Sequence, residues 1–254
     1  MIDKSSIIHK DAKVSGSAEI GPYVLIGPNV KIGNNVTIHS HVNISGDTTI
    51  GDGCSIFPFA SIGNYPQDLK YKGEKTKLII GKNNKIREYV TINPGTKGGG
   101  GITEIGNNCL FMISSHIAHD CKIGNNVVIA NNVPIGGHGI IEDDVIIGGN
   151  AAVHQFTRIG KMAMIGGMTG VTTDVIPYGL SLGNRNYLEG INLIGLRRKN
   201  IPNKDILELT IAYKKIFITS KLNGEFKKNP LVKNVIEFIT KDKKRSICTP
   251  FSKE

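Results

Sequence analysis

The sequence contains no tryptophan, few other aromatic residues and no long hydrophobic run. Aromatic residues make up 6% of the 254 residues, so large rings cannot supply most of the core. No segment approaches the ~18 to 20 consecutive apolar residues that a membrane-spanning helix needs. The first ten residues, MIDKSSIIHK, lack the basic and apolar regions of a secretory signal. We therefore expect a cytoplasmic protein without a membrane span.

Cysteine is also scarce, and its spacing excludes two common kinds of site. None of the four cysteines forms a CxxC pair, which argues against a zinc ribbon or a thioredoxin-like site. A disulfide framework is not expected in a chain of this length without signs of export. The four positions are Cys54, Cys109, Cys121 and Cys248.

Charge of one sign is concentrated at one end of the chain. The formal net charge is +10, and the segment from residue 197 to 254 carries +9 of it, with 15 basic against 6 acidic residues. Such a basic segment indicates an acidic partner, which can be nucleic acid, an anionic membrane surface or an acidic protein. The alternative is a solvated helical surface with surplus lysine.

Isoleucine and valine recur at every sixth position over most of the chain. The three series run over residues 2–62, 80–92 and 105–171, and 25 of their 26 positions are Ile or Val, the exception being Phe111. A period of six fits neither an α-helix nor an alternating strand. Three strand-plus-turn units can close a triangular coil of 18 residues, and stacked coils then bury the aliphatic ladder. Asparagine pairs such as Asn34-Asn35 and Asn125-Asn126 suit the turns. The pattern predicts a mainly β protein, a prism of stacked coils.

Two interruptions and an end point divide the chain. Between the first two series the in-register positions are Asp68 and Glu74, which predicts an excluded loop near residues 64–77. The next gap contains GTKGGGG at 95–101, which predicts a second, flexible excursion and lacks the GK[ST] ending of a phosphate-binding loop. We expect residues 1–187 to form the prism and 188–254 a small C-terminal α-helical domain.

Two helices are expected in that C-terminal part. Asn203 or Asp205 is predicted to cap the first, and Asn229 followed by Pro230 to open the second.

The coil arithmetic gathers histidines at one corner of the prism. Residues 18 apart lie on adjacent coils, so Gly137 and Gln155 are stacked over His119, and His138 over Asp120. His116 and His154 belong to the same patch, within about 10 Å. Surface or turn histidines are the ordinary alternative for any one of these residues.

The residue types in this patch suit acyl transfer to a hydroxyl group. A neutral imidazole such as that of His119 can take a proton from the hydroxyl. Asp120 can orient the imidazole, and the backbone N–H of Gly137 can stabilise an oxyanion. Because no activated Ser or Cys nucleophile is evident, direct attack of a hydroxyl on a thioester is favoured over an acyl-enzyme.

Several motifs resemble those of known enzymes. The repeat resembles the left-handed parallel β-helix of hexapeptide-repeat proteins. The segments HIAHDC (116–121), GGH (136–138) and AVHQF (152–156) resemble the family of acyl-carrier-protein–UDP-N-acetylglucosamine O-acyltransferases, as do PQDLKY (66–71) and the helical tail. The likeness covers essentially the whole chain. It implies a homotrimer that transfers a (3R)-3-hydroxyacyl group from acyl carrier protein to the sugar 3-hydroxyl, the first step of lipid A biosynthesis. It implies neither a cofactor nor a metal, and no nucleic acid.

The resemblance also implies roles for individual residues. His119 corresponds to the general base, Asp120 to its partner and Gly137 to the oxyanion donor. Met164 and Gly167 match the stretch that limits acyl length, where glycine leaves room for a longer chain. Substrate contacts are implied at Gln67, Asp68, Lys70, His116, His138, His154, Gln155, Asn192 and Arg198. The acidic carrier protein would dock on the basic C-terminal helices, with Arg197, Arg198, Lys199 and Lys204 as candidates. One departure is Ile194, where the family often has glutamate.

Other functions compete with this one. A zinc carbonic anhydrase-like enzyme could use His116, His119 and His138 as ligands, although the spacing differs from that family's. Another hexapeptide-repeat acyl- or acetyltransferase is a second alternative. The N-acyltransferase of the same pathway carries an N-terminal domain for which the repeats, starting at Ile2, leave no room. A non-catalytic scaffold or nucleic-acid binder is disfavoured because the basic segment has few aromatic residues and no known binding motif.

Overall fold

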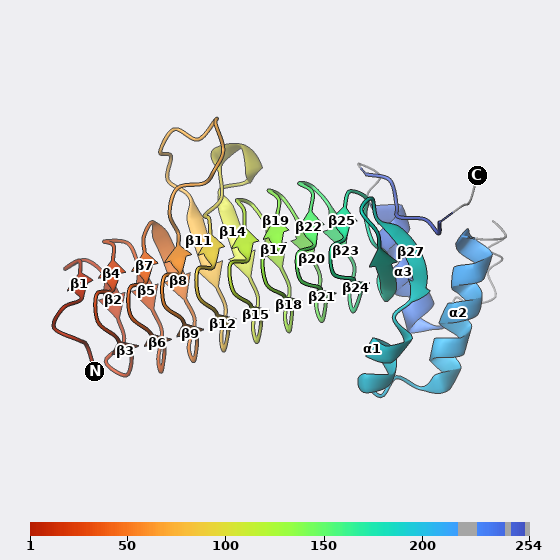
Figure 1. The fold of residues 1–254 in the computed structure, drawn as a ribbon, viewed down its shortest axis with the longest axis horizontal. Coiled ribbons are helices and arrows are strands. Elements are labelled where there is room, and N and C mark those ends of the chain that lie inside the picture. The colour runs from red at the N-terminus through yellow and green to blue at the C-terminus, as the bar shows by residue number, and fades with distance from the viewer. Residues whose placement is uncertain (218–227, 242–244, 252–254) are drawn as a thin grey trace.

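The chain forms a left-handed parallel β-helix followed by a small helical part (Figure 1). The computed structural model describes residues 1–217, 228–241 and 245–251. Most strands are two residues long, because the other residues of each six-residue unit form the turn to the next strand.

Three sheets form the faces of the prism, and strands three apart in the chain are hydrogen-bonded neighbours. The nine-stranded sheet contains β1 (Ile7–Ile8), β4 (Leu25–Ile26), β7 (Asn43–Ile44), β10 (Ser61–Ile62), β13 (Thr91–Ile92), β16 (His116–Ile117), β19 (Pro134–Ile135), β22 (Ala152–Val153) and β25 (Gly170–Val171). The eight-stranded sheet contains β2 (Lys13–Val14), β5 (Lys31–Ile32), β8 (Asp47–Ile50), β11 (Lys77–Ile80), β14 (Ile102–Ile105), β17 (Lys122–Ile123), β20 (Ile140–Ile141) and β23 (Arg158–Ile159). The ten-stranded sheet contains β3 (Glu19–Ile20), β6 (Thr37–Ile38), β9 (Ser55–Ile56), β12 (Lys85–Ile86), β15 (Leu110–Phe111), β18 (Val128–Ile129), β21 (Ile146–Ile147), β24 (Met164–Ile165), β26 (Gly179–Leu182) and β27 (Tyr187–Ile191).

The three edges where these sheets meet are called corners here. The first corner joins the nine-stranded to the eight-stranded sheet, the second joins the eight-stranded to the ten-stranded sheet, and the third returns to the nine-stranded sheet. Many corner residues have positive φ, among them Asn35 at 53° and Asn126 at 57°. The prediction that asparagine pairs supply turns that tolerate left-handed backbone is therefore confirmed.

The core is the aliphatic ladder. From Ile20 onward, the ladder residues of every coil are buried, and Phe111, the exception to the pattern, is also fully enclosed. Each buried Ile or Val contributes roughly 1.5 to 3 kcal/mol. The ladder therefore builds a continuous core without tryptophan.

Two excursions leave the prism at the first corner, side by side in Figure 1. One connects β10 to β11, and the other connects β13 to β14 and contains the 3₁₀ turn η1 (Lys97–Gly99). The backbone N–H of Gly95 donates to the carbonyl oxygen of Lys77 at 3.1 Å, and that of Lys97 donates to a carboxylate oxygen of Glu74 at 3.3 Å. The two excursions are thus joined at their bases and along their length.

The C-terminal part begins with an antiparallel hairpin. Strands β26 and β27 extend the ten-stranded sheet, and three helices follow: α1 (Leu193–Arg198), α2 (Asn203–Phe217) and α3 (Pro230–Lys241). The predicted boundary between residues 187 and 188 falls inside β27. The division of the chain into two domains at this point stays a prediction.

Two of the expected helix starts can be compared with the structure. Asn229 caps α3 as predicted, because its side-chain oxygen accepts from the backbone N–H of Leu231 at 2.9 Å. The predicted cap of α2 is wrong, since Asn203 and Asp205 lie inside the first turn. The short helix α1, capped by Asn192, was not predicted.

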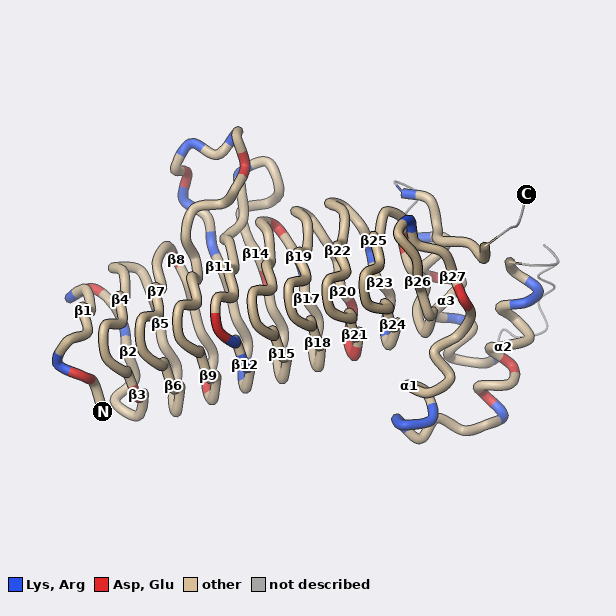
Figure 2. The backbone as a smooth tube through the Cα atoms, in the orientation of Figure 1, with Lys and Arg blue, Asp and Glu red and all other residues tan. Residues whose placement is uncertain are grey.

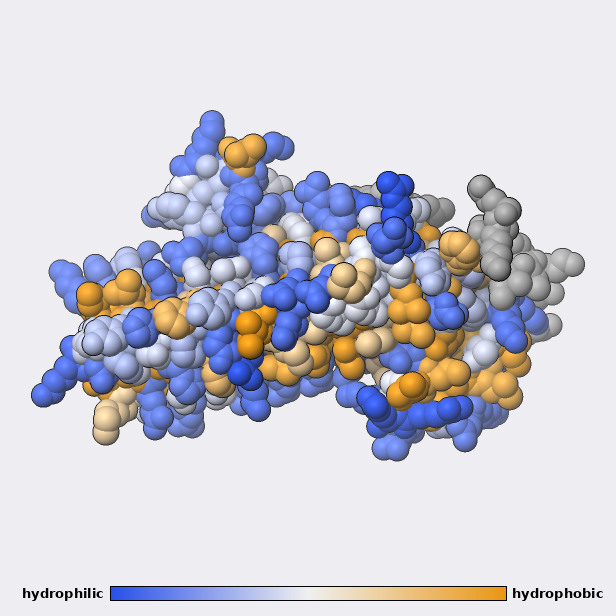
Figure 3. All heavy atoms as spheres, viewed as in Figure 1, coloured by the Kyte–Doolittle hydropathy of each residue, from blue (hydrophilic) through white to orange (hydrophobic). Residues whose placement is uncertain are grey.

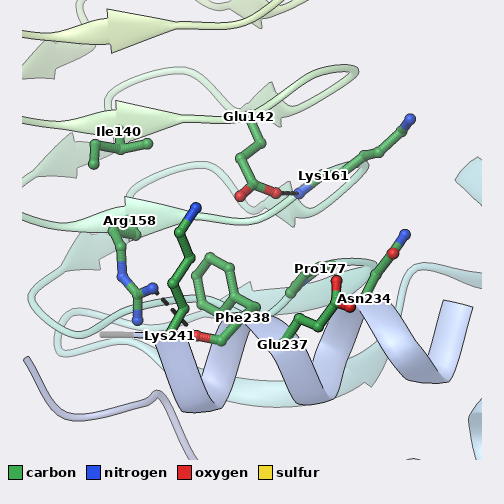
Figure 4. Close-up of a pocket in the computed structure, with 9 residues that line it drawn as sticks. All are labelled: Ile140, Glu142, Arg158, Lys161, Pro177, Asn234, Glu237, Phe238 and Lys241. Atoms are coloured by element: carbon green, nitrogen blue, oxygen red, sulfur yellow. Dashed lines mark hydrogen bonds between the residues drawn. The ribbon is translucent and has the colours of Figure 1, made fainter. Parts of the chain in front are cut away.

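Helix α3 packs against the eight-stranded sheet around Arg158, which also forms a buried ion pair with Asp174. Arg158 on β23 donates through Nε to Asp174 at 2.7 Å and through Nη1 to the carbonyl oxygen of Phe238 at 3.1 Å. Its guanidinium also stacks 4.3 Å from the centre of the Phe238 ring. Figure 4 shows Arg158 and Phe238 in the lining of a cavity between sheet and helix, which has a volume of about 340 Å³. This contact fastens the helical part to the prism.

No helix in the described part of the chain is long and apolar enough to cross a membrane. In the view of Figure 3, the excursions are mostly hydrophilic, while hydrophobic residues gather near α1 and α2.

Candidate active site

The predicted histidine cluster lies along the first corner. His119 and Asp120 form the turn after β16, and one coil further on the backbone N–H of His138 donates to the carbonyl oxygen of His119 at 3.0 Å. On the next coil, the N–H of Phe156 donates to the carbonyl oxygen of Gly137 at 2.9 Å. The stacking order derived from the 18-residue spacing is confirmed.

His119 and Asp120 form a hydrogen-bonded pair. The distance between His119 Nδ1 and Asp120 Oδ2 is 2.8 Å, the side chain of Asp120 is 1% exposed and that of His119 14%. Because an ionised carboxylate only accepts hydrogen bonds, we assign the imidazole proton to Nδ1. The Nε2 atom of His119 then carries a free lone pair, which is the arrangement a general base needs.

The second excursion covers the carboxylate of Asp120. Thr96 donates through its backbone N–H to Oδ1 at 2.9 Å and through its hydroxyl to Oδ2 at 2.6 Å. Gly99 passes so close to the carboxylate that any Cβ at this position would collide with it. The glycine-rich segment is therefore held on Asp120, an arrangement that periodicity could not reveal because the segment lies outside the repeat.

Gly137 lies directly against the ring of His119. A Cβ at this position would be 2.7 Å from Cε1 and 2.8 Å from Nε2 of His119, so only glycine leaves that nitrogen accessible. Among the described residues, the backbone N–H of Gly137 has no hydrogen-bond acceptor. This N–H is therefore available to a ligand beside the imidazole.

Two further histidines, His138 and His116, lie in surroundings that favour the uncharged ring. The ring of His138 meets that of His119 edge-on at 5.1 Å and stacks on Phe156 at 4.3 Å. His116 shares a hydrogen bond of 2.7 Å with the hydroxyl of Thr91. Burial lowers the pKa of both His138 and His116, because it disfavours the imidazolium form.

A cavity of about 470 Å³ opens at this corner. Asp68 and Lys70 of the first excursion line it together with Asp120 and His138, so the structure brings these four predicted residues together. Gln67 is exposed and is not part of its lining.

His154 and Gln155 lie on the next coil, and both are exposed. The Nδ1 atom of His154 is 2.8 Å from a guanidinium nitrogen of Arg245, which also lines the cavity. The sequence analysis did not identify Arg245, because it lies 91 residues away from His154 and outside every motif.

Four predicted residues lie away from the first corner. Met164 is on β24 in the ten-stranded sheet, and Gly167 is exposed at the third corner. Asn192 and Arg198 belong to the α1 segment, where the side chain of Asn192 accepts from the N–H of Gly195 at 3.0 Å and donates to the carbonyl oxygen of Met162 at 2.9 Å. One chain therefore does not bring them to His119.

The same cluster contains three groups that could in principle ligate a metal ion. Ligand atoms of His119, Asp120 and His138 lie within 4.8 Å of one another. However, Asp120 Oδ2 already accepts hydrogen bonds from Thr96 and His119, and His116, which the zinc alternative requires, is bonded to Thr91. The geometry fits acid–base chemistry better than metal coordination.

Comparison with known proteins agrees with this geometry. Residues 102–137 match the family model for bacterial transferase hexapeptide repeats, and residues 174–248 match the second domain of UDP-N-acetylglucosamine O-acyltransferase. The chain is 48% identical to an acyl-[acyl-carrier-protein]–UDP-N-acetylglucosamine O-acyltransferase of Rickettsia typhi, with 97% of each chain covered. It is 45% identical to the enzyme of that name from Aliarcobacter butzleri, with 96% of each covered. A solved UDP-N-acetylglucosamine O-acyltransferase from Moraxella catarrhalis superposes with a TM-score of 0.93 at 42% identity, covering 97% of this chain and 98% of that one.

The stacked hexapeptide coils and the histidine–carboxylate corner define a hexapeptide-repeat acyltransferase. More narrowly, the chain belongs to the family of acyl-[acyl-carrier-protein]–UDP-N-acetylglucosamine O-acyltransferases.

Proposed function

We propose that this enzyme transfers a (3R)-3-hydroxyacyl group from acyl carrier protein to the 3-hydroxyl of UDP-N-acetylglucosamine, the first step of lipid A biosynthesis. Family membership supports the reaction class and both substrates. The cytoplasm is the proposed compartment, a prediction that cell fractionation tests.

The observation that carries the mechanism is the position of His119 Nε2. This nitrogen lies beside Gly137, its ring is fixed through Nδ1 by the buried Asp120, and the N–H of Gly137 is available next to it. A hydroxyl that donates to Nε2 therefore sits close to a donor for the thioester oxygen, as general-base catalysis with an oxyanion site requires.

The proposed step balances with these groups alone. His119 takes the proton of the sugar hydroxyl as its oxygen forms a bond to the thioester carbon. The carbonyl oxygen becomes an oxyanion, stabilised by the N–H of Gly137, while Asp120 stabilises the imidazolium. When the carbon–sulfur bond breaks, His119 returns the proton to the leaving thiolate. No covalent enzyme intermediate is needed.

Substrate contacts are proposed in two groups. The first group shares the corner of His119 and consists of Gln67, Asp68, Lys70, His116, His138, His154 and Gln155. The second group lies elsewhere on the chain and consists of Asn192, Arg198, Met164 and Gly167. Because Ile194 is 65% exposed and apolar, it offers no carboxylate to the nucleotide at the position where the family often has glutamate.

We propose a homotrimer because the second group must come from another copy. Met164 belongs to the sheet opposite the first corner, so an acyl chain held at His119 can reach it only on a neighbouring prism. An exposed column of rings at the third corner, Tyr23, His41, Phe59 and Tyr89, stacks at centroid distances of 5.0 to 5.1 Å and offers apolar surface for packing. Light scattering is expected to give a molar mass three times the 27.4 kDa of one chain.

We propose that the acidic carrier protein docks on the basic C-terminal helices. Figure 2 shows basic residues gathered at α1 and at the start of α2. Arg197, Arg198 and Lys204 are exposed there. Lys199 already pairs with Asp144 at 2.7 Å, so we expect it to contribute less.

The test is turnover of defined substrates followed by mass spectrometry. Purified protein is incubated with a panel of 3-hydroxyacyl carrier proteins and UDP-sugars, and UDP-N-acetylglucosamine is expected to gain one hydroxyacyl group.

His119→Ala is expected to lower kcat by ~10² or more while the oligomer stays intact. Near-normal turnover of this variant would remove His119 from its proposed role. A stoichiometric metal whose chelation abolishes activity would instead favour the zinc alternative.

A further inference from the structure

The C-terminal segment 245–251 is fastened to the last coil of the prism. The backbone N–H of Asp174 donates to the carbonyl oxygen of Ser246 at 3.0 Å, and that of Cys248 donates to the carbonyl oxygen of Asp174 at 2.8 Å. This parallel bridge fixes the backbone just after Arg245. The side chain of Arg245 therefore starts from a defined position.

From there the guanidinium of Arg245 reaches back to the first corner. Its Nη1 donates to the carbonyl oxygen of Thr172 at 2.9 Å, and its Nη2 lies 2.8 Å from Nδ1 of His154. The same side chain lines the cavity that contains Asp120 and His138. The end of the chain thus contributes a cation to the proposed active site.

The contact with His154 has a direct chemical consequence. A guanidinium is always protonated and only donates, so Nδ1 of His154 must accept. The neutral ring then carries its proton on Nε2. The carbonyl oxygen of Gln155, 3.1 Å from Nδ1, would favour the opposite tautomer if Arg245 were absent.

We infer that Arg245 is a positioning residue that fixes His154 as the Nε2–H tautomer. The inference rests on the proposed function, in which His154 contacts the UDP-sugar. In that role the fixed Nε2–H is a ready donor to a substrate oxygen, whereas the opposite tautomer would present a lone pair to that oxygen.

The first experiment measures the tautomer and needs no activity. Protein labelled with ¹⁵N-histidine is studied by NMR at about pH 8, where an ordinary imidazole is neutral, and His154→Gln identifies the signals. In the native protein, His154 is expected to be protonated mainly on Nε2. In Arg245→Ala, a substantial fraction is expected to move to Nδ1. The control Arg185→Ala, which removes an exposed arginine on the neighbouring hairpin, is expected to change nothing.

The second experiment separates positioning from a merely structural role. Arg245→Ala is expected to raise KM for the UDP-sugar about tenfold, the effect of losing one charge-assisted hydrogen bond, with kcat changed much less. Arg245→Lys keeps the charge without the forked geometry, so its KM is expected to lie in between.

Two outcomes overturn the inference. One is a native His154 protonated on Nδ1. The other is a tautomer unchanged in Arg245→Ala, whether or not stability and kcat fall. If the native protein does not acylate UDP-N-acetylglucosamine, the proposed function fails, and the NMR result still decides whether Arg245 sets the tautomer.

Discussion

Gly137→Ala separates the catalytic geometry from the stability of the fold. The backbone of Gly137 does not have a positive φ, so alanine introduces no backbone strain. Its only severe contact is with the ring of His119, where the new Cβ would lie 2.7 Å from Cε1 and 2.8 Å from Nε2. Either the methyl group occupies the place proposed for the substrate hydroxyl, or the ring rotates and loses its 2.8 Å hydrogen bond to Asp120.

The expected loss is that of general-base catalysis. Correct proton transfer contributes typically 10² to 10⁴ in rate, so kcat of Gly137→Ala is expected to fall by ~10² or more. Initial rates of acyl transfer from 3-hydroxyacyl carrier protein to UDP-N-acetylglucosamine measure this. The melting temperature is expected to change little, because the group that must move is the ring of His119, which is partly exposed at the first corner.

The matched control is Gly16→Ala. Gly16 occupies the same turn position at the second corner, is exposed, and has no atom within 4 Å of the place of its Cβ. The kcat of this control variant is expected to match that of the native protein. Normal turnover by Gly137→Ala would refute the reasoning, because the base could then not work from the position of His119 Nε2.

Three further predictions concern stability and reactivity. Thr96→Val removes a hydroxyl that donates to the buried carboxylate of Asp120, so urea unfolding is expected to show a loss of about 1 to 3 kcal/mol in the free energy of unfolding. Burial lowers the pKa of His138 in the folded protein below its ordinary value near 6.5. Between these two pKa values the unfolded state binds more protons than the folded state, so the free energy of unfolding falls as the pH drops through that window. His138→Gln is expected to reduce the fall in melting temperature between pH 7.5 and 5.5, and the exposed His9→Gln is not. Burial raises the pKa of Cys109 to about 11 and of Cys121 to about 12, so iodoacetamide is expected to modify these thiols only after unfolding.

Each of these predictions can fail in a specific way. An unchanged urea midpoint for Thr96→Val would mean that the backbone N–H alone satisfies the carboxylate. Equal acid sensitivity of the His138→Gln and native proteins would assign the fall to other groups. Rapid alkylation of native protein would show that the buried thiols become exposed by local opening.

The period of six determined the prism because burial selects an aliphatic residue at one position of each six-residue unit. The same period determined which coils carry His119, Gly137 and His138, since hydrogen-bonded stacking converts a spacing of 18 or 19 residues into contact. The resemblance of the motifs then predicted the family, and the sequence identity to its members confirms this prediction. A repetitive fold makes long-range neighbours readable from the chain alone.

The repeat gave no information about segments outside its register. Thr96 and Gly99 close over Asp120 from an excursion, and the direction of an excluded loop does not follow from periodicity. The start of α2 was misplaced because polar residues that favour a cap also occur in a first helical turn.

The amino-acid sequence by itself determined the prism, the corner that carries the histidines and the family. Only the tertiary structure decided which groups complete that corner. The hydroxyl of Thr96 and the guanidinium of Arg245 arrive from an excluded loop and from the C-terminal segment, whose paths depend on packing against the finished coils.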